Sequence, residues 1–201
     1  MVSIILAAAT GLSAPSPANS FSNNDYPAWA LARDASVAAV ISLVVDPQGK
    51  AVQCINLREI GDPRLAKEVC RILSRKRVQP PTLRDGQKVH AFLETMIRLF
   101  LPDTDKGRQI MVLHSPPDAE LSVNQLPNGE SAEVGIILAY DSAGKITDCA
   151  PSETEKQVAL ANVACSQKVM FDNAIKNDIS GQSVAYVTRK RVLFAVSPQV
   201  K

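Results

Sequence analysis

Cysteine and histidine are the residue types in this sequence that most readily support chemistry at a site. Cys54 and Cys70 lie sixteen positions apart, and Cys149 and Cys165 repeat this separation. Zinc sites usually contain close pairs such as C-x-x-C, and a redox-active dithiol has its cysteines close together at the start of a helix. Neither pattern is present, so the sequence predicts no metal site, no redox centre and no cofactor.

Acid–base and nucleophilic catalysis also lack a complete set of residues. His90 precedes Glu94 on an expected strand, but no nucleophile is placed to use this pair. Ser74 and Ser166 lack the base and the orienting group that a reactive serine needs. The unexplained insert at residues 115–129 is the only feature that leaves room for an enzyme. The sequence therefore predicts a non-catalytic protein.

The charge balance argues against a polyanionic partner. The chain has 22 basic and 20 acidic residues, which gives a formal net charge of +2. Such a balance produces no long-range field that would favour nucleic acid or an anionic membrane. The basic run at residues 75–77 is typical of a helix end, where cations complement the helix dipole. Contact of this run with an acidic partner is the alternative, and no nucleic-acid partner is expected.

The first twenty residues have the composition of a secretory leader. An apolar run from Ile4 to Ala14 is followed by Ser16-Pro17-Ala18, which places small residues where cleavage could occur. The run is too short to span a bilayer comfortably, and no later segment is apolar enough to do so. We therefore assign residues 1–20 to a signal peptide and expect no stable membrane span.

The sequence repeats itself at an offset of 95 positions. The matched pairs include turn, helix and cysteine positions: Ile41 with Ile136, Asp46 with Asp141, Gly49 with Gly144, Cys54 with Cys149, Leu65 with Leu160, Cys70 with Cys165 and Gly86 with Gly181. One shared register for so many residue types indicates a duplication in which each copy is one supersecondary unit.

The first copy shows the elements that such a unit contains. Alternating apolar residues at 39–45 predict a strand with one buried face, and Asp46-Pro47-Gln48-Gly49 has the composition of a type I turn. Asp62 and Pro63 suit an N-cap and a first helical residue before an apolar stripe, and a last strand covers residues 89–101. The order strand, strand, helix, strand predicts a helix on one face of an antiparallel sheet.

The second copy keeps the first strand, its turn, a helix around residues 158–168 and a last strand at residues 184–196. Proline and glycine interrupt the chain between the copies. We place repeat 1 at residues 21–102, a linker and lead-in at 103–130 and repeat 2 at 131–198. The predicted fold class is α+β, with two tandem small modules, each an antiparallel sheet of about three strands packed by one or two helices.

The repeat also bears on the cysteines. Four cysteines allow three connectivities, and cysteines of an exported chain are usually paired because an oxidising compartment preserves the bond. If each copy descends from one unit, the pairs are Cys54 with Cys70 and Cys149 with Cys165. Each bond would then join the end of a strand to the helix packed over it. We take this pairing as a hypothesis.

Residues 24–101 resemble the TonB C-terminal domain, the periplasmic module that ends energy-transducing proteins of Gram-negative bacteria. Tyr26-Pro27-Ala28 matches the Tyr-Pro segment of the family, and V-D-P-Q-G-K at residues 45–50 matches its first hairpin turn. R-K-R-V-Q-P at 75–80 is similar to the segment that ends its helix, although Val78 replaces the expected aromatic residue. The second copy, at residues 134–194, lacks both the Tyr-Pro and the basic-proline segments.

This resemblance implies a function through backbone contacts. Domains of the family bind a short extended peptide of an outer-membrane transporter by adding it as a strand beside their last strand, where an exposed edge offers unpaired N–H and C=O groups. The resemblance therefore implies that the chain is a periplasmic protein-interaction module with a protein or peptide partner. The candidate partner is an outer-membrane transporter. The implied partner-binding residues are Tyr26, Pro27, Ala28, Val89, Ala91, Leu93, Thr95, Ile97 and Leu99.

In a second hypothesis, the sheet edges pair with each other and not with a peptide. No membrane anchor or long proline-rich spacer, both of which an energy transducer needs, is evident in the sequence, so we expect a free double module. The alternative function is a self-paired structural envelope protein with no open peptide site. Its pairing would occur between the two copies or in a homodimer.

Overall fold

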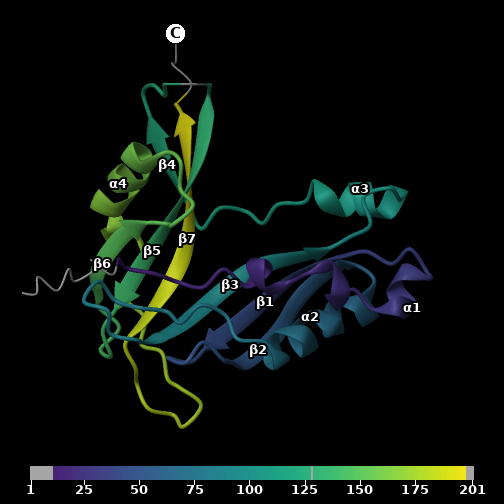
Figure 1. The fold of residues 1–201 in the computed structure, drawn as a ribbon. Helices are drawn as coiled ribbons and strands as arrows, with labels where there is room; N and C mark the ends of the chain where they lie inside the picture. The colour runs from purple at the N-terminus through teal and green to yellow at the C-terminus, as the bar shows by residue number, and fades with distance from the viewer. Residues whose placement is uncertain (1–10, 128, 198–201) are drawn as a thin grey trace, which may run out of the picture.

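The computed structural model describes residues 11–127 and 129–197. Over these residues the chain forms four α-helices and one mixed sheet of seven strands, with the order β2-β1-β3-β7-β5-β6 and with β4 also paired to β7 (Figure 1). The β3–β7 and β4–β7 pairs are parallel and the others are antiparallel. The α+β class is confirmed, but the expected separate sheets are joined into one.

The first half of the sheet is built around β1 (Val37–Val45), which pairs with β2 (Ala51–Gly61) and β3 (His90–Leu99). Helix α2 (Pro63–Arg75) begins as predicted, because the Asp62 carboxylate accepts hydrogen bonds from the first free N–H groups of the helix. Its predicted apolar stripe is buried against the sheet, and the helix thus covers one face of the first half.

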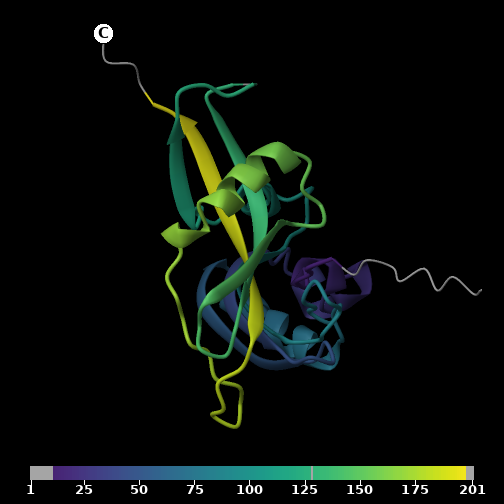
Figure 2. The same cartoon turned by 90° about the vertical axis from the view of Figure 1, so that its left-hand side faces the viewer.

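The second half has the same order of elements. Strand β5 (Ser131–Tyr140) pairs with β6 (Ile146–Pro151) and β7 (Tyr186–Val196), and α4 (Val158–Ser166) follows β6. Figure 2 shows α4 lying across β5 and β7. A short 3₁₀ turn at Lys168–Met170 follows this helix. The second half therefore presents the four elements that the first half presents.

The hairpin turns of the two halves agree in detail. The Asp46 carboxylate accepts from the N–H groups of Gln48 and Lys50, and the Asp141 carboxylate accepts from those of Ala143 and Lys145. The glycines that close these turns have φ values of +79° at Gly49 and +77° at Gly144, a conformation that glycine adopts without a side-chain clash. The predicted turn is therefore confirmed in both halves, while the duplication itself stays a prediction.

The segment between the halves is more ordered than its prolines suggested. It contains α3 (Asp105–Met111), which the Thr104 side chain caps, and β4 (Ala119–Val123), which pairs in parallel with the end of β7. The predicted linker and lead-in at residues 103–130 thus contain one short helix and one short strand. Apolar residues alternate in β4 at Ala119, Leu121 and Val123, but the pattern is short and prolines flank it, so the sequence did not predict this strand.

The N-terminal part of the described chain lies over the sheet. It contains 3₁₀ turns at Pro17–Ser20 and Asn23–Asp25 and a short helix α1 (Ala28–Leu31). Leu12 and Ala14 are buried, although the sequence assigned them to the leader. Residues 1–10 of that leader lie outside the described residues. Within the described ranges, no helix has both the length and the apolar character needed to cross a membrane.

Two apolar cores lie on opposite faces of the sheet. Adjacent residues of a strand point to opposite faces. In β5, Ile136 and Leu138 contact the cluster that contains α4, whereas Ile137 and Ala139 contact the cluster that contains α2. The α2 cluster thus draws residues from both halves. This shared core, together with the β3–β7 pair, joins the two halves.

Candidate functional site

The outer edge of β3 is open along most of its length. On that side β3 pairs with β7 only through His90 with Tyr186 and Ala91 with Val187. Beyond these pairs the two strands diverge, as Figure 1 shows, and among the described residues no other strand pairs with this side of β3. The remaining residues of β3 therefore form a strand edge inside the molecule rather than at its periphery.

Alternate residues of β3 direct their backbone groups toward this edge. Leu101, just after the strand, donates its N–H toward β1, to Oγ of Ser36 at 3.3 Å. Because N–H directions alternate along a strand, residues of the same parity as Leu101 face β1. Glu94, Met96 and Arg98 therefore present their N–H and C=O groups at the outer edge.

A cleft opens on one face of the sheet where β3 and β7 diverge. Its volume is about 310 Å³, and its walls include Leu93 and Thr95 of β3 and Arg189 and Arg191 of β7. Pro17 of the N-terminal segment also borders it. The cleft thus lies beside Glu94, the first of the three residues whose backbone groups face the open edge.

A second cavity, of about 420 Å³, lies at the same divergence on the face that α4 covers. Aromatic rings form much of its wall: Phe92 meets Tyr186 edge-on at 5.2 Å between centroids, and Tyr140 stacks on Tyr186 at 4.6 Å. Burial of the two tyrosine rings raises the pKa of both phenols. These rings offer an apolar surface to a side chain that enters beside β3.

The cations around the cleft are paired with carboxylates. Lys190 lies 2.9 Å from the Asp118 carboxylate, and Arg191 lies 3.5 Å from that of Glu133. Arg189 contacts Glu153 at 2.5 Å. The cleft therefore has mixed and nearly balanced charge, which suits a peptide better than a polyanion.

Residues 112–118 run beside the open edge as a linker between α3 and β4. Arg98 donates to the carbonyls of Met111 and Leu113 at 2.5 and 3.1 Å, and Arg191 donates to that of Pro116 at 2.6 Å. A smaller cavity of about 170 Å³ separates this linker from β3. The linker is thus tied to both strands that border the cleft, and it narrows the approach to β3.

The predicted partner-binding residues of β3 lie on the strand, but their backbone groups do not face its open edge. Their side chains point into the core under α2, except for half-buried Thr95, and the alternation turns their backbone groups toward β1: Ala91, Leu93, Thr95, Ile97 and Leu99. Val89 precedes the strand, is buried in the same core and donates its N–H to the carbonyl of Pro81. The sequence indicated which strand is the last of the first half, but not which of its alternate residues direct their backbone groups to the open edge. Partner binding by these residues stays a prediction, and the structure adds Glu94, Met96 and Arg98.

The Tyr-Pro segment lies at the far end of β1, away from the β3–β7 contact. Tyr26 packs on the core, and its hydroxyl donates to the carbonyl of Ala35. Pro27 is the N-cap residue of α1, and Ala28 is the first residue of that helix. The structure therefore gives these residues a visible role in anchoring the N-terminal segment, and it does not place them beside the cleft.

Two side chains of the basic run at the end of α2 bind groups of the same chain. Lys76 contacts the Asp25 carboxylate at 2.5 Å, and this hydrogen bond is the main reason that the pKa of Asp25 falls to about 2. Lys76 also donates to the carbonyl of Ser20, and Arg77 donates to that of Gln48. These contacts tie the N-terminal segment and the first hairpin to the helix end.

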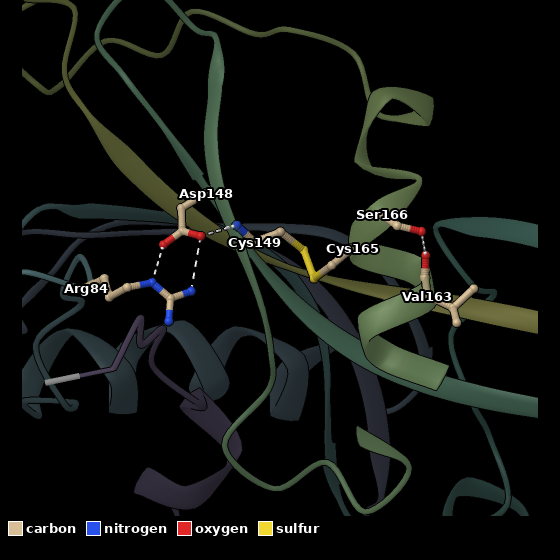
Figure 3. The surroundings of a disulfide bond; sticks show 6 residues. All are labelled: Arg84, Asp148, Cys149, Val163, Cys165 and Ser166. Carbon is tan, nitrogen blue, oxygen red and sulfur yellow. Dashed lines mark hydrogen bonds and ion pairs between the residues drawn. A yellow bond between two sulfur atoms is a disulfide. The ribbon is translucent and has the colours of Figure 1, made fainter. Parts of the chain in front are cut away.

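Both disulfides form as the repeat indicated. Cys54 bonds to Cys70 and Cys149 to Cys165, and the Cα–Cα distance is 5.5 Å in each. Each bond ties a strand to the helix that follows it, β2 to α2 and β6 to α4, and Figure 3 shows the second of these bonds. The pairing hypothesis is confirmed, and no free cysteine remains among the described residues.

Together these features define an α+β protein in which one strand inside the sheet leaves most of its outer edge unpaired. Residues 22–98 match the model of the family described as Gram-negative bacterial TonB protein C-terminal. This part of the chain, which contains α2, nearly all of β3 and the first disulfide, is therefore similar to that family. The match does not extend to the second half. No curated protein and no solved structure matches the chain.

Proposed function

We propose that this protein is a non-catalytic interaction module of the periplasm that binds an extended peptide as an added strand beside β3. The observation that carries the proposal is the outer edge of β3, where Glu94 directs its backbone groups toward the cleft, and Met96 and Arg98 direct theirs toward the smaller cavity beside the linker. A peptide strand would satisfy these groups, as in β-augmentation. The family of residues 22–98 supports a protein partner.

The cleft supports an extended peptide over a folded surface. A strand laid along β3 would place alternate side chains on the two faces of the sheet. On one face they would meet the aromatic wall at Phe92 and Tyr186, and on the other the polar wall near Thr95 and Arg189. We propose that the partner segment comes from an outer-membrane transporter and alternates apolar with polar residues.

The compartment and the architecture belong to the same proposal. Two disulfides persist best in an oxidising compartment, and the matching family is one of the Gram-negative envelope. We propose that the halves, at residues 21–102 and 131–198, are two copies of one module. Identical disulfide spacing and matching hairpin turns support this division, and the binding role belongs to the first copy.

Titration by NMR tests the binding proposal. The full-length protein with both disulfides intact is labelled with ¹⁵N and titrated with synthetic peptides that copy the periplasmic N-terminal segments of outer-membrane transporters. We expect the largest shift changes at the amides of Glu94, Met96 and Arg98. A panel of such peptides that leaves every β3 amide unchanged would overturn the proposal.

A matched pair of variants separates backbone from side-chain recognition. Glu94→Pro removes an outward N–H without removing a bond to β1, and Glu94→Ala removes only the side chain. Loss of one hydrogen bond, about 1 kcal/mol, should weaken peptide binding roughly fivefold in Glu94→Pro. Glu94→Ala should bind nearly as the parent does. Equal effects of both variants would contradict strand addition.

A self-paired structural protein is the second candidate, and the β3–β7 contact favours it. His90 and Ala91 already use part of the β3 edge within the chain. Amide exchange of the free protein separates the two candidates. Fast exchange at Met96 and Arg98 indicates an open edge, whereas strong protection there, or a dimer in sedimentation equilibrium, indicates that the edge is closed.

A further inference from the structure

Strand β4 covers the outer edge of β7 in the second half. Its five residues pair in parallel with the end of β7, from Ala119 with Val192 to Val123 with Val196 (Figure 1). Among the described residues β4 pairs with no other strand. None of its five residues is buried, whereas β7 and the neighbouring β5 both contain buried residues. The strand thus lies on β7 in the way that a bound peptide would.

The edge that β4 covers corresponds to the open edge of β3. At the repeat offset of 95 positions, Met96 of β3 corresponds to Arg191 of β7. Arg191 directs its backbone groups outward, because its C=O accepts from the Asp118 N–H and its N–H donates to the Asp118 carboxylate, both at 2.8 Å. Met96 has the same outward direction in β3. The two halves therefore present equivalent edges, and β4 covers the second one.

The side chains around β4 indicate which peptides fit this edge. Leu121 and Val123 pack against the cluster that contains α4. The Asp118 carboxylate, just before the strand, also lies 2.9 Å from Nζ of Lys190. Glu120 points to the opposite face and is exposed. The edge therefore fits an extended peptide in which an acidic residue precedes alternating apolar residues.

We infer that the β7 edge is a second strand-binding site, and that β4 is its resident ligand, which an extended peptide of the same pattern replaces. A strand without buried residues opens at a lower free energy than a strand of the core, so β4 can leave while the rest of the fold remains. The inference rests on the strand addition of the proposed function and extends it to the second half.

Two proline substitutions separate β4 from the edge that it covers. The Val123 C=O accepts from the Ser197 N–H, so residues of the same parity, including Leu121, direct their backbone groups toward β7. Leu121→Pro removes one of these N–H groups and an apolar contact, and it should release β4. Ser122→Pro is the matched control, because the N–H of residue 122 faces the unpaired side of β4.

A synthetic peptide that copies residues 115–125 is then titrated into the full-length, ¹⁵N-labelled protein with both disulfides intact. We expect the peptide to shift the β7 amides of Leu193 and Ala195 in Leu121→Pro. The parent and Ser122→Pro should bind it there at least about tenfold more weakly, because only molecules with β4 released can bind. A folded Leu121→Pro protein whose β7 amides do not respond overturns the inference.

Two variants of the peptide test the inferred pattern. Asp118→Ala in the peptide removes the carboxylate that binds the Arg191 N–H and should weaken binding roughly fivefold. Glu120→Ala in the peptide changes an exposed side chain and should leave the affinity unchanged. Equal affinities of the two variant peptides would contradict selection of an acidic residue at this position.

Amide exchange of the parent tests the same inference if Leu121→Pro does not fold. The amides of Leu121 and Val123 should have protection factors at least about tenfold lower than that of Ile137 in β5, because β4 opens without global unfolding. Equal protection of the two strands would overturn the exchange of β4.

The NMR readout distinguishes failure of this inference from failure of the proposed function. Shifts at Leu193 and Ala195 report on the β7 edge, whereas shifts at Glu94 and Met96 with transporter peptides report on β3. Binding at β3 with an inert β7 edge overturns the second site alone.

Discussion

Arg84 donates two hydrogen bonds to the carboxylate of Asp148, from Nε at 2.9 Å and from Nη2 at 3.1 Å (Figure 3). Arg84 lies in the turn before β3, and Asp148 lies in β6 of the other half. This bidentate pair therefore joins the two halves at the end opposite to the open β3 edge. It stands beside the Cys149–Cys165 disulfide, since Asp148 directly precedes Cys149.

We expect Asp148→Asn to destabilise the protein by about 0.5–1 kcal/mol at pH 7, since Arg84 is exposed and Asp148 is only half-buried, so solvent screens the pair. The hydrogen bonds from Arg84 hold the pKa of Asp148 below its usual value of 3.8. A lowered carboxyl pKa contributes stability above pH 3.8 that is lost as the pH falls through the folded-state pKa. Urea denaturation at pH 7 and at pH 3 should show a larger effect of the substitution at pH 7.

Asp103→Asn is the charge-matched control for this measurement, because Asp103 is exposed and its carboxylate makes no contact with Arg84. It should leave the unfolding free energy within about 0.5 kcal/mol of the parent at both pH values. An Asp148→Asn effect that does not change between pH 7 and pH 3 would show that the pair contributes nothing to the pH dependence.

The two disulfides should contribute equally to stability. Each closes a loop of sequence separation 16, for which the chain-entropy model gives about 3 kcal/mol. We therefore expect the double variants Cys54→Ala/Cys70→Ala and Cys149→Ala/Cys165→Ala to lose similar unfolding free energy. Denaturant unfolding measures both losses. A loss confined to one variant would indicate that the two halves unfold as unequal units.

The sequence predicted the local features of the fold because each has a local cause. The Asp62 cap, the apolar stripe of α2 and the Asp46 turn all follow from residues within a few positions of one another. The disulfide pairing is not local, but the repeat supplied the missing information by giving both cysteine pairs one offset. These features were therefore predictable without knowledge of the tertiary structure.

The features that the sequence did not predict depend on contacts between the halves. His90 and Tyr186 are far apart in sequence, and their parallel pairing follows from how two sheets meet rather than from any periodicity. Leu12 and Ala14 have the same small apolar character in a leader as in a buried segment, so composition does not distinguish the two. Likewise, the residues of β3 that face the open edge could be assigned only from the structure, in which the Leu101 N–H donates to Ser36.

Gly144 should tolerate alanine less well than Gly181 does. The φ values are similar, at +77° and +85°, so both substitutions cost about 1–2 kcal/mol in backbone strain. A Cβ on Gly144 would also lie 2.5 Å from backbone atoms of Ala174 and Ile175, whereas one on Gly181 would meet nothing within 4 Å. We expect Gly144→Ala to lose at least about 1 kcal/mol more by thermal or urea unfolding.

Equal losses in the two variants would show that the loop at Ala174 moves aside without cost. This loop follows the 3₁₀ turn after α4, and Ala174 donates its N–H to the carbonyl of Gly144 at 2.9 Å. Any movement that relieves the overlap therefore strains this hydrogen bond. The comparison measures how firmly the hairpin of the second half is fixed to the chain that returns to β7.

The linker at residues 112–118 should limit access of a peptide to β3, a prediction that depends on the proposed function. Arg98→Gln shortens the side chain that binds the carbonyls of Met111 and Leu113, while the outward backbone groups of residue 98 remain. We expect faster amide exchange in the linker and an association rate with the peptide that is several-fold higher, because a looser linker exposes the edge more often. Stopped-flow fluorescence with a labelled peptide measures this rate.

Arg58→Gln on β2 removes the same charge from an exposed site away from the cleft, so it should leave the rate unchanged. An Arg98→Gln rate equal to that of Arg58→Gln would show that the peptide reaches β3 without displacing the linker.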